Sequence, residues 1–119
     1  MCNSNKTLLL TASNKLRLAD GETSRDGRVE IYHNGRWGTV CPDNWDVNEV
    51  RVVCKYLGYS GEGAVQNTFQ GGGGPVWISG LNCTGNETNI AECDHVGWEI
   101  SDPGCNYAIQ AGLTCYVGK

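Results

Sequence analysis

Cysteine usage sets the strongest limits on how this chain folds: seven of its 119 residues are cysteines, at positions 2, 41, 54, 83, 93, 105 and 115. No two of them have the Cys-x-x-Cys spacing typical of a zinc site or a thioredoxin-like centre, and His33 and His95 are isolated. Disulfides are therefore the better interpretation, and they indicate an oxidising, extracellular location. Such cross-links help a chain of this length, because it buries a smaller share of its surface than a longer one.

Bulk composition fits one secreted or cell-surface domain rich in turns. The chain has 17 glycines, and its net charge of −4 argues against nucleic-acid binding. Its longest apolar run near the start, Leu8–Leu10, is too short for a signal-peptide core or a membrane span, so we expect no membrane insertion by this segment. We expect the precursor to carry a signal or further domains. Three N-glycosylation sequons, at Asn5, Asn82 and Asn86, agree with a secreted glycoprotein.

The first half of the chain predicts short strands. Leu16–Leu18 alternates, a turn is predicted at Asp26-Gly27, and Arg28–His33 alternates again. Asn34-Gly35 is the favoured two-residue hairpin turn, because both residues tolerate positive φ. Arg36–Cys41 is then the partner strand, which makes a hairpin the firmest local prediction.

One helix follows. Asp46 can cap it, Glu49 can complete a capping box, and Gly58 can end it in a left-handed conformation. Its apolar stripe has helical spacing and consists of Val50, Val53, Cys54 and Leu57.

The remaining chain predicts a flexible glycine-rich loop at 71–74, a strand at Val76–Ile78 and a last strand within 108–116. One helix among several short strands indicates an α+β fold.

Four segments of the sequence resemble motifs of a known family. RVEIYHNGRWGTVC (28–41), VRVVCKYLGY (50–59), GPVWISGLNCTGNE (74–87) and AGLTC (111–115) are similar to motifs of scavenger receptor cysteine-rich domains, in family order and spacing. The similarity covers about residues 16–116, leaving 1–15 as a polar flank and 117–119 as a tail. The resemblance implies a curved antiparallel sheet that cradles one helix.

The family has a six-cysteine and an eight-cysteine branch. The positions of the extra bridge hold Asp26 and Tyr59 here, so the chain resembles the six-cysteine branch, group A. The resemblance implies Cys41–Cys105, Cys54–Cys115 and Cys83–Cys93, whereas spacing alone leaves 15 pairings open. Cys2 lies outside this pattern, as a thiol of the flank or a link to another domain.

Catalysis is not expected. Neither histidine lies in a catalytic motif, and Gly71–Gly74 leads into Pro75 and a strand rather than into the helix of a phosphate-binding loop.

Many family members bind a divalent cation, often Ca²⁺. The resemblance places ligands at 42–43, 79–80 and 109–110, where this chain keeps one acid, Asp43. A lone carboxylate is a poor Ca²⁺ site, since the ion takes six to eight oxygens. Asp46 and Glu49 are better explained as helix caps.

Charge is unevenly distributed: eight of the nine basic residues lie in the first 55 positions. Arg25, Arg28 and Arg36 sit in or beside the hairpin, which predicts a basic face together with Lys15 and Arg17. The alternative is ordinary strand charge balanced by neighbouring acids, namely Asp20, Glu22, Asp26 and Glu30. Among the four tryptophans, Trp98 is the best candidate for an exposed anchor.

Two functions remain open. One is a pattern-recognition or scavenging module of innate immunity, which binds polyanionic glycans or microbial surface components. The other is an adhesion or spacer module of a larger receptor or secreted protease, which binds another extracellular protein.

Overall fold

The structure is a computed structural model that describes residues 15–70, 75–95, 97–98 and 109–116. In chain order its elements are β1 (Leu16–Asp20), β2 (Asp26–His33), β3 (Arg36–Val40), α2 (Val47–Tyr56), β4 (Gly63–Gln70), β5 (Val76–Ile78), the 3₁₀ turn η1 (Ile90–Glu92) and β6 (Ile109–Cys115).

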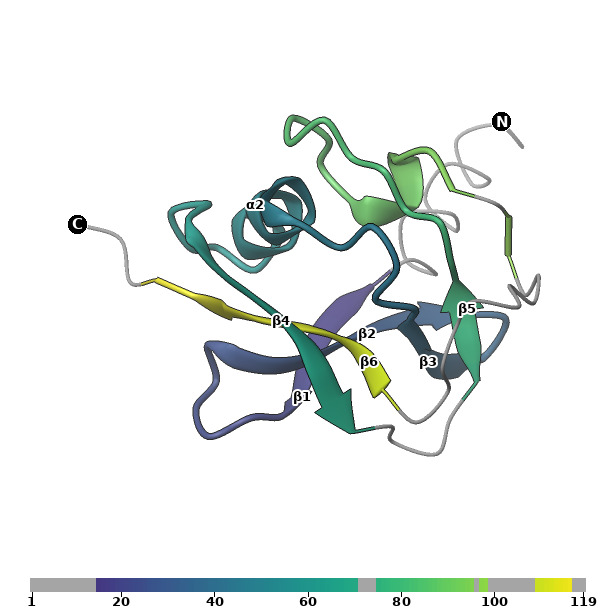
Figure 1. Ribbon diagram of the computed structural model, residues 1–119, viewed down its shortest axis with the longest axis horizontal. Coiled ribbons are helices and arrows are strands. Elements are labelled where there is room, and N and C mark those ends of the chain that lie inside the picture. Colours follow the sequence, from purple (N-terminus) through teal and green to yellow (C-terminus); the bar gives the residue numbers. More distant parts are fainter. Residues whose placement is uncertain (1–14, 71–74, 96, 99–108, 117–119) are drawn as a thin grey trace, which may run out of the picture.

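The strands form one curled sheet in the order β4-β6-β2-β3-β5, with β1 along the other edge of β2. Figure 1 shows α2, the one α-helix of the described residues, lying to one side of this sheet. The predicted α+β architecture is confirmed, although the sheet is mixed: β3 and β5 run parallel, and the other strand pairs of the described chain are antiparallel. Parallel pairing arises because β5 reaches β3 through a long crossover that contains the helix and β4.

The predicted hairpin is confirmed. Asn34 and Gly35 both have positive φ, 56° and 81°, as a tight hairpin turn requires, and His33 pairs with Arg36 beside it.

The predicted turn at Asp26-Gly27 was wrong, because Asp26 already begins β2 and Gly27 pairs with Asp20. Asp26 instead holds the preceding turn closed, accepting bonds from the Thr23 hydroxyl and from the backbone N–H groups of Glu22 and Thr23. The bond from the Thr23 side chain, followed by those from the two backbone groups, lowers the pKa of Asp26.

The predicted helix limits are also confirmed. The Asp46 carboxylate accepts from Asn48 N, and the Glu49 carboxylate accepts from Asp46 N at 2.7 Å, which completes the capping box. Gly58 follows the C-cap Leu57 with φ 94°.

The core lies between the helix and the sheet. Val29, Val50, Val53 and Leu113 are fully buried within one hydrophobic cluster that joins β2, α2 and β6. Two elements were missing from the sequence prediction, β4 and the short turn η1. β4 lies at the sheet edge and pairs with β6.

Candidate functional site

Disulfides fix the segments around the candidate sites. Cys54–Cys115 joins α2 to β6, and Cys83–Cys93 closes the segment that contains η1. Cys41 is disulfide-bonded as well. Its predicted partner Cys105 lies outside the described residues, and so does Cys2.

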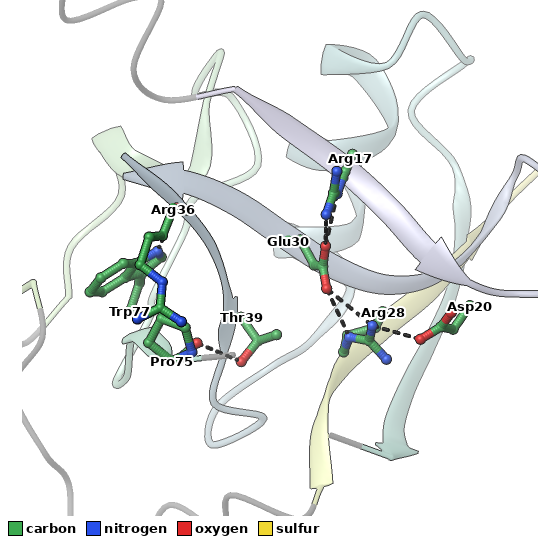
Figure 2. Close-up of polar contacts among 8 residues, drawn as sticks. All are labelled: Arg17, Asp20, Arg28, Glu30, Arg36, Thr39, Pro75 and Trp77. Atoms are coloured by element: carbon green, nitrogen blue, oxygen red, sulfur yellow. Dashed lines mark hydrogen bonds and ion pairs between the residues drawn. The ribbon is translucent and has the colours of Figure 1, made fainter. Parts of the chain in front are cut away.

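The expected basic face is built differently from the sequence prediction. Arg28 has a side chain only 6% exposed, and its Nη2 lies 3.0 Å from Glu30 Oε2 and 2.7 Å from Asp20 Oδ2. Glu30 also pairs with Arg17 at 2.8 Å, so the four side chains form a charge ladder across β1 and β2 (Figure 2). Burial opposes the charge of Arg28, but its bonds to Asp20 and Glu30 prevail and raise its pKa.

The strand register explains this ladder. Arg17 pairs with Glu30 and Ala19 with Arg28, which places opposite charges side by side on one face of the antiparallel pair. For Arg17 and Arg28, balance by neighbouring acids therefore describes the structure better than a free basic face.

The other two expected arginines have different surroundings. Arg25 donates from Nη1 to Cys115 O at 3.0 Å, which ties its side chain to the end of β6. Arg36 is exposed at the start of β3, beside Trp77 and away from the charge ladder that contains Arg28 (Figure 2). Arg36 thus lies apart from Arg28, and Arg25 is bonded to a backbone carbonyl of β6.

Trp98 belongs to an aromatic cluster rather than standing alone. Its ring stacks on His33 with centroids 3.7 Å apart and an interplanar angle of 8°. His95 meets Trp98 edge-on at 5.7 Å, and Trp77 meets His33 edge-on at 5.2 Å. Trp98 is half-buried, and the cluster joins β2, β5 and the segment after η1.

A polar cleft of about 700 Å³ lies beside the start of the helix. It is lined by Pro42, Asn44, Trp45, Asp46, Gly80, Asn82, Asp94 and His95. Trp45 is buried and donates from Nε1 to Gly112 O at 2.8 Å, so it forms a fixed wall. Asp94 is exposed, and His95 Nδ1 is buried without a hydrogen-bond partner. Among the described residues, the cleft is lined by carboxylates and amides but by neither lysine nor arginine. This composition suits a cationic ligand group.

Asp43, the weak metal candidate, has a structural role next to this cleft. Both of its carboxylate oxygens accept from Gly80 N, at 3.0 and 3.2 Å. Ser79 is buried with an unpartnered hydroxyl, and Gln110 is buried on β6. These residues offer one carboxylate, which is already bonded, together with one hydroxyl and one amide. Such a set does not fit the oxygen-rich coordination that Ca²⁺ requires.

Among the histidines, cysteines and acidic residues that the structure describes, one group has ligand atoms close enough to hold a metal: Cys83, Glu87 and Cys93. Both sulfurs are joined in a disulfide, so they offer no thiolate to an ion.

Glu49 is the helix cap that the sequence predicts, and its carboxylate makes a second bond that the sequence does not indicate. Glu49 is 1% exposed, and its Oε2 accepts from Cys83 N at 2.7 Å while its Oε1 accepts from Asp46 N. Burial raises the pKa of Glu49 to about 7; the Cys83 N–H opposes this rise, and the Asp46 side chain adds to it. Glu49 thereby links the helix start to the Cys83 segment behind the cleft. No local sequence signal carries that contact, which spans 34 positions.

Two of the predicted sequons can be placed. Asn82, at the cleft, and Asn86 are both exposed, whereas Asn5 lies outside the described residues. In the described part of the chain, no helix has the length and apolar character needed to span a bilayer.

Comparison with known proteins supports the same fold. The sequence model of the scavenger receptor cysteine-rich domain family matches residues 19–116 of this chain. The third SRCR domain of murine neurotrypsin is 37% identical, with a TM-score of 0.75, over 87% of this chain and 98% of that one. The SRCR domain of mouse MARCO, in its dimeric form, is 36% identical, with a TM-score of 0.70, over 84% of this chain and 93% of that one.

The N-terminal extracellular domain of the lymphocyte receptor CD5 shares the fold at 21% identity, with a TM-score of 0.51, over 86% of this chain and 91% of that one. The two disulfides, the capped helix and the strands from β2 to β6 all lie inside the matched residues. The chain therefore belongs to the scavenger receptor cysteine-rich domain family.

Proposed function

We propose that this domain is a binding module of an extracellular receptor or secreted protein, and that its ligand is another protein rather than a polyanion. Scavenger receptor cysteine-rich domains are non-catalytic receptor modules, so binding is the activity to explain. The observation that carries the choice is the charge ladder: Arg17 and Arg28 already neutralise Glu30 and Asp20.

The cost of freeing these arginines supports this choice. A polyanion that took Arg28 would have to break a nearly buried pair and leave Glu30 with one cation instead of two. The net charge of −4 also opposes attraction of a polyanion at long range. Polyanion or microbial recognition would depend on the more exposed cations, such as Lys15 and Arg36.

The cleft supplies the complementary chemistry. Asp46 and Asp94 place negative charge around a hollow whose wall includes the fixed Trp45. A lysine or arginine side chain of a partner protein could donate charge-assisted hydrogen bonds to Asp94, whose carboxylate makes no other bond in the described structure. We place the anchor of the proposed interface at this cleft.

Surface plasmon resonance can test the proposal with a lysine- and arginine-rich peptide as probe. The comparison uses wild type, Asp94→Asn in the cleft, and Glu62→Gln as a matched exposed control. We expect Asp94→Asn to weaken peptide binding about tenfold, on the scale of one charge-assisted bond, and Glu62→Gln to leave it unchanged. Equal binding by all three proteins would overturn the assignment to the cleft.

A further inference from the structure

A second, smaller hollow of about 270 Å³ lies between the end of α2 and the loop after Cys83. It is lined by Lys55, Tyr56, Asn86, Glu87 and Thr88. Three of these five residues are the complete sequon Asn86-Glu87-Thr88. A volume slightly below the roughly 300–1,000 Å³ of drug-sized pockets suits a small group such as one sugar ring.

The loop holds Asn86 firmly at the rim of this hollow. The Glu87 carboxylate accepts from Thr84 N and Gly85 N at 3.0 and 3.1 Å, and Asn86 N donates to the Thr84 hydroxyl. Lys55 Nζ donates to Gly85 O at 3.0 Å, which ties the loop to the helix. Both walls of the hollow are therefore fixed relative to each other.

The groups that face the hollow fit a carbohydrate. Tyr56 is a large aromatic residue left 39% exposed, and it can pack against the C–H face of a sugar ring. Lys55 and Thr88 add polar atoms at the edge of the hollow. The Asn86 side-chain amide is exposed and has no hydrogen-bond partner among the described residues, so it is available for attachment.

We propose that Asn86 carries an N-linked glycan whose first N-acetylglucosamine lies in this hollow against Tyr56. The sugar donor is a lipid-diphosphate-linked oligosaccharide of the secretory pathway. A bond forms between Asn86 Nδ2 and C1 of the sugar as the C1–O bond to the diphosphate breaks. The diphosphate leaves with the electron pair, and Nδ2 loses one proton.

The sequon at Asn82 has different surroundings. Asn82 lines the polar cleft, its N–H donates to Asp94 O at 2.8 Å, and its sequon includes the disulfide-bonded Cys83. A glycan there would fill the cleft proposed for the partner protein. The two hollows share no lining residue, so a glycan on Asn86 leaves that cleft open and its presence does not depend on the proposed function.

The test uses protein secreted from cells that make only high-mannose glycans. Glycopeptide mass spectrometry locates the sugar, and thermal unfolding compares three forms: intact, trimmed to the first N-acetylglucosamine by an endoglycosidase, and fully deglycosylated by an amidase. Because the amidase converts the attachment site to aspartate, Asn86→Asp serves as its control. Tyr56→Ala tests the packing, and Tyr116→Ala is a control at an exposed tyrosine that does not line the hollow.

We expect a glycan on Asn86, and a melting temperature that is kept after trimming but falls by about 3 °C after complete removal. In Tyr56→Ala that fall should disappear, whereas in Tyr116→Ala it should persist. An unmodified Asn86 would overturn the proposal. So would a stabilisation that is lost on trimming, or one that is equally large without Tyr56.

Discussion

Replacing Glu49 by glutamine tests the buried link between the helix and the Cys83 segment. In the folded protein burial raises the pKa of Glu49 from 4.5 to about 7. Below pH 4.5 both folded and unfolded states are protonated, and stability is fully present. As the pH rises to 7 the unfolded state loses its proton first, so stability falls. At about 1.4 kcal/mol per pKa unit, the loss is about 3 kcal/mol.

The assay is urea unfolding followed by tryptophan fluorescence, with disulfides intact, at several pH values between 4 and 8. Glu49→Gln has no proton to lose, so the stability of wild type relative to this variant should fall by about 3 kcal/mol as pH rises. Glu62→Gln, at an exposed site, should keep a constant difference from wild type. A constant difference for Glu49→Gln, or one that grows in favour of wild type with pH, would refute the reasoning.

Three further predictions concern cross-links, charge and metal. Removing the Cys54–Cys115 disulfide, whose cysteines are 61 positions apart, should lower the free energy of unfolding in urea by about 4 kcal/mol. Non-reducing peptide mapping should recover this pair, and a Cys54–Cys83 link would contradict the assignment. Arg28→Ala should destabilise the domain by about 2–3 kcal/mol because Glu30 loses one of its two cations. Arg36→Ala, at an exposed site, should change stability by less than about 0.5 kcal/mol, and equal effects of the two variants would count against the charge ladder. Calorimetry should detect no Ca²⁺ binding in the low micromolar range, since Asp43 is bonded to Gly80; tight binding would reveal ligands other than those considered.

Elements with local signals could be predicted from the sequence. Asn34-Gly35 specifies its hairpin, and Asp46 with Glu49 specifies the helix start, because each depends on residues only a few positions apart. β4 gave no such signal: it is an edge strand, and its paired residues in β6 lie 39 to 52 positions later, from Gln70 with Ile109 to Gly63 with Cys115.

The candidate sites depend on contacts distant in sequence. Alternation along β2 separates Arg28 from the core residue Val29, which predicted an exposed arginine. Pairing with β1 instead brought Asp20 against its guanidinium, and Glu30 on the same face of β2 completed the ladder. The cleft likewise unites residues of three separate segments, 42–46, 80–82 and 94–95. The sequence contains these residues, but it does not show that they come together in one cleft.

Binding to immobilised heparin is the most direct test of whether this domain recognises protein rather than polyanion. At about 0.15 M salt, where exposed charges interact over about 8 Å, we expect weak binding by wild type. Arg36→Ala should reduce that binding, while a lysine- and arginine-rich peptide should bind wild type more tightly than heparin does. Tight heparin binding that is lost in Arg25→Ala/Arg28→Ala/Arg36→Ala, in protein shown by circular dichroism to be folded, would contradict the account and restore the polyanion interpretation.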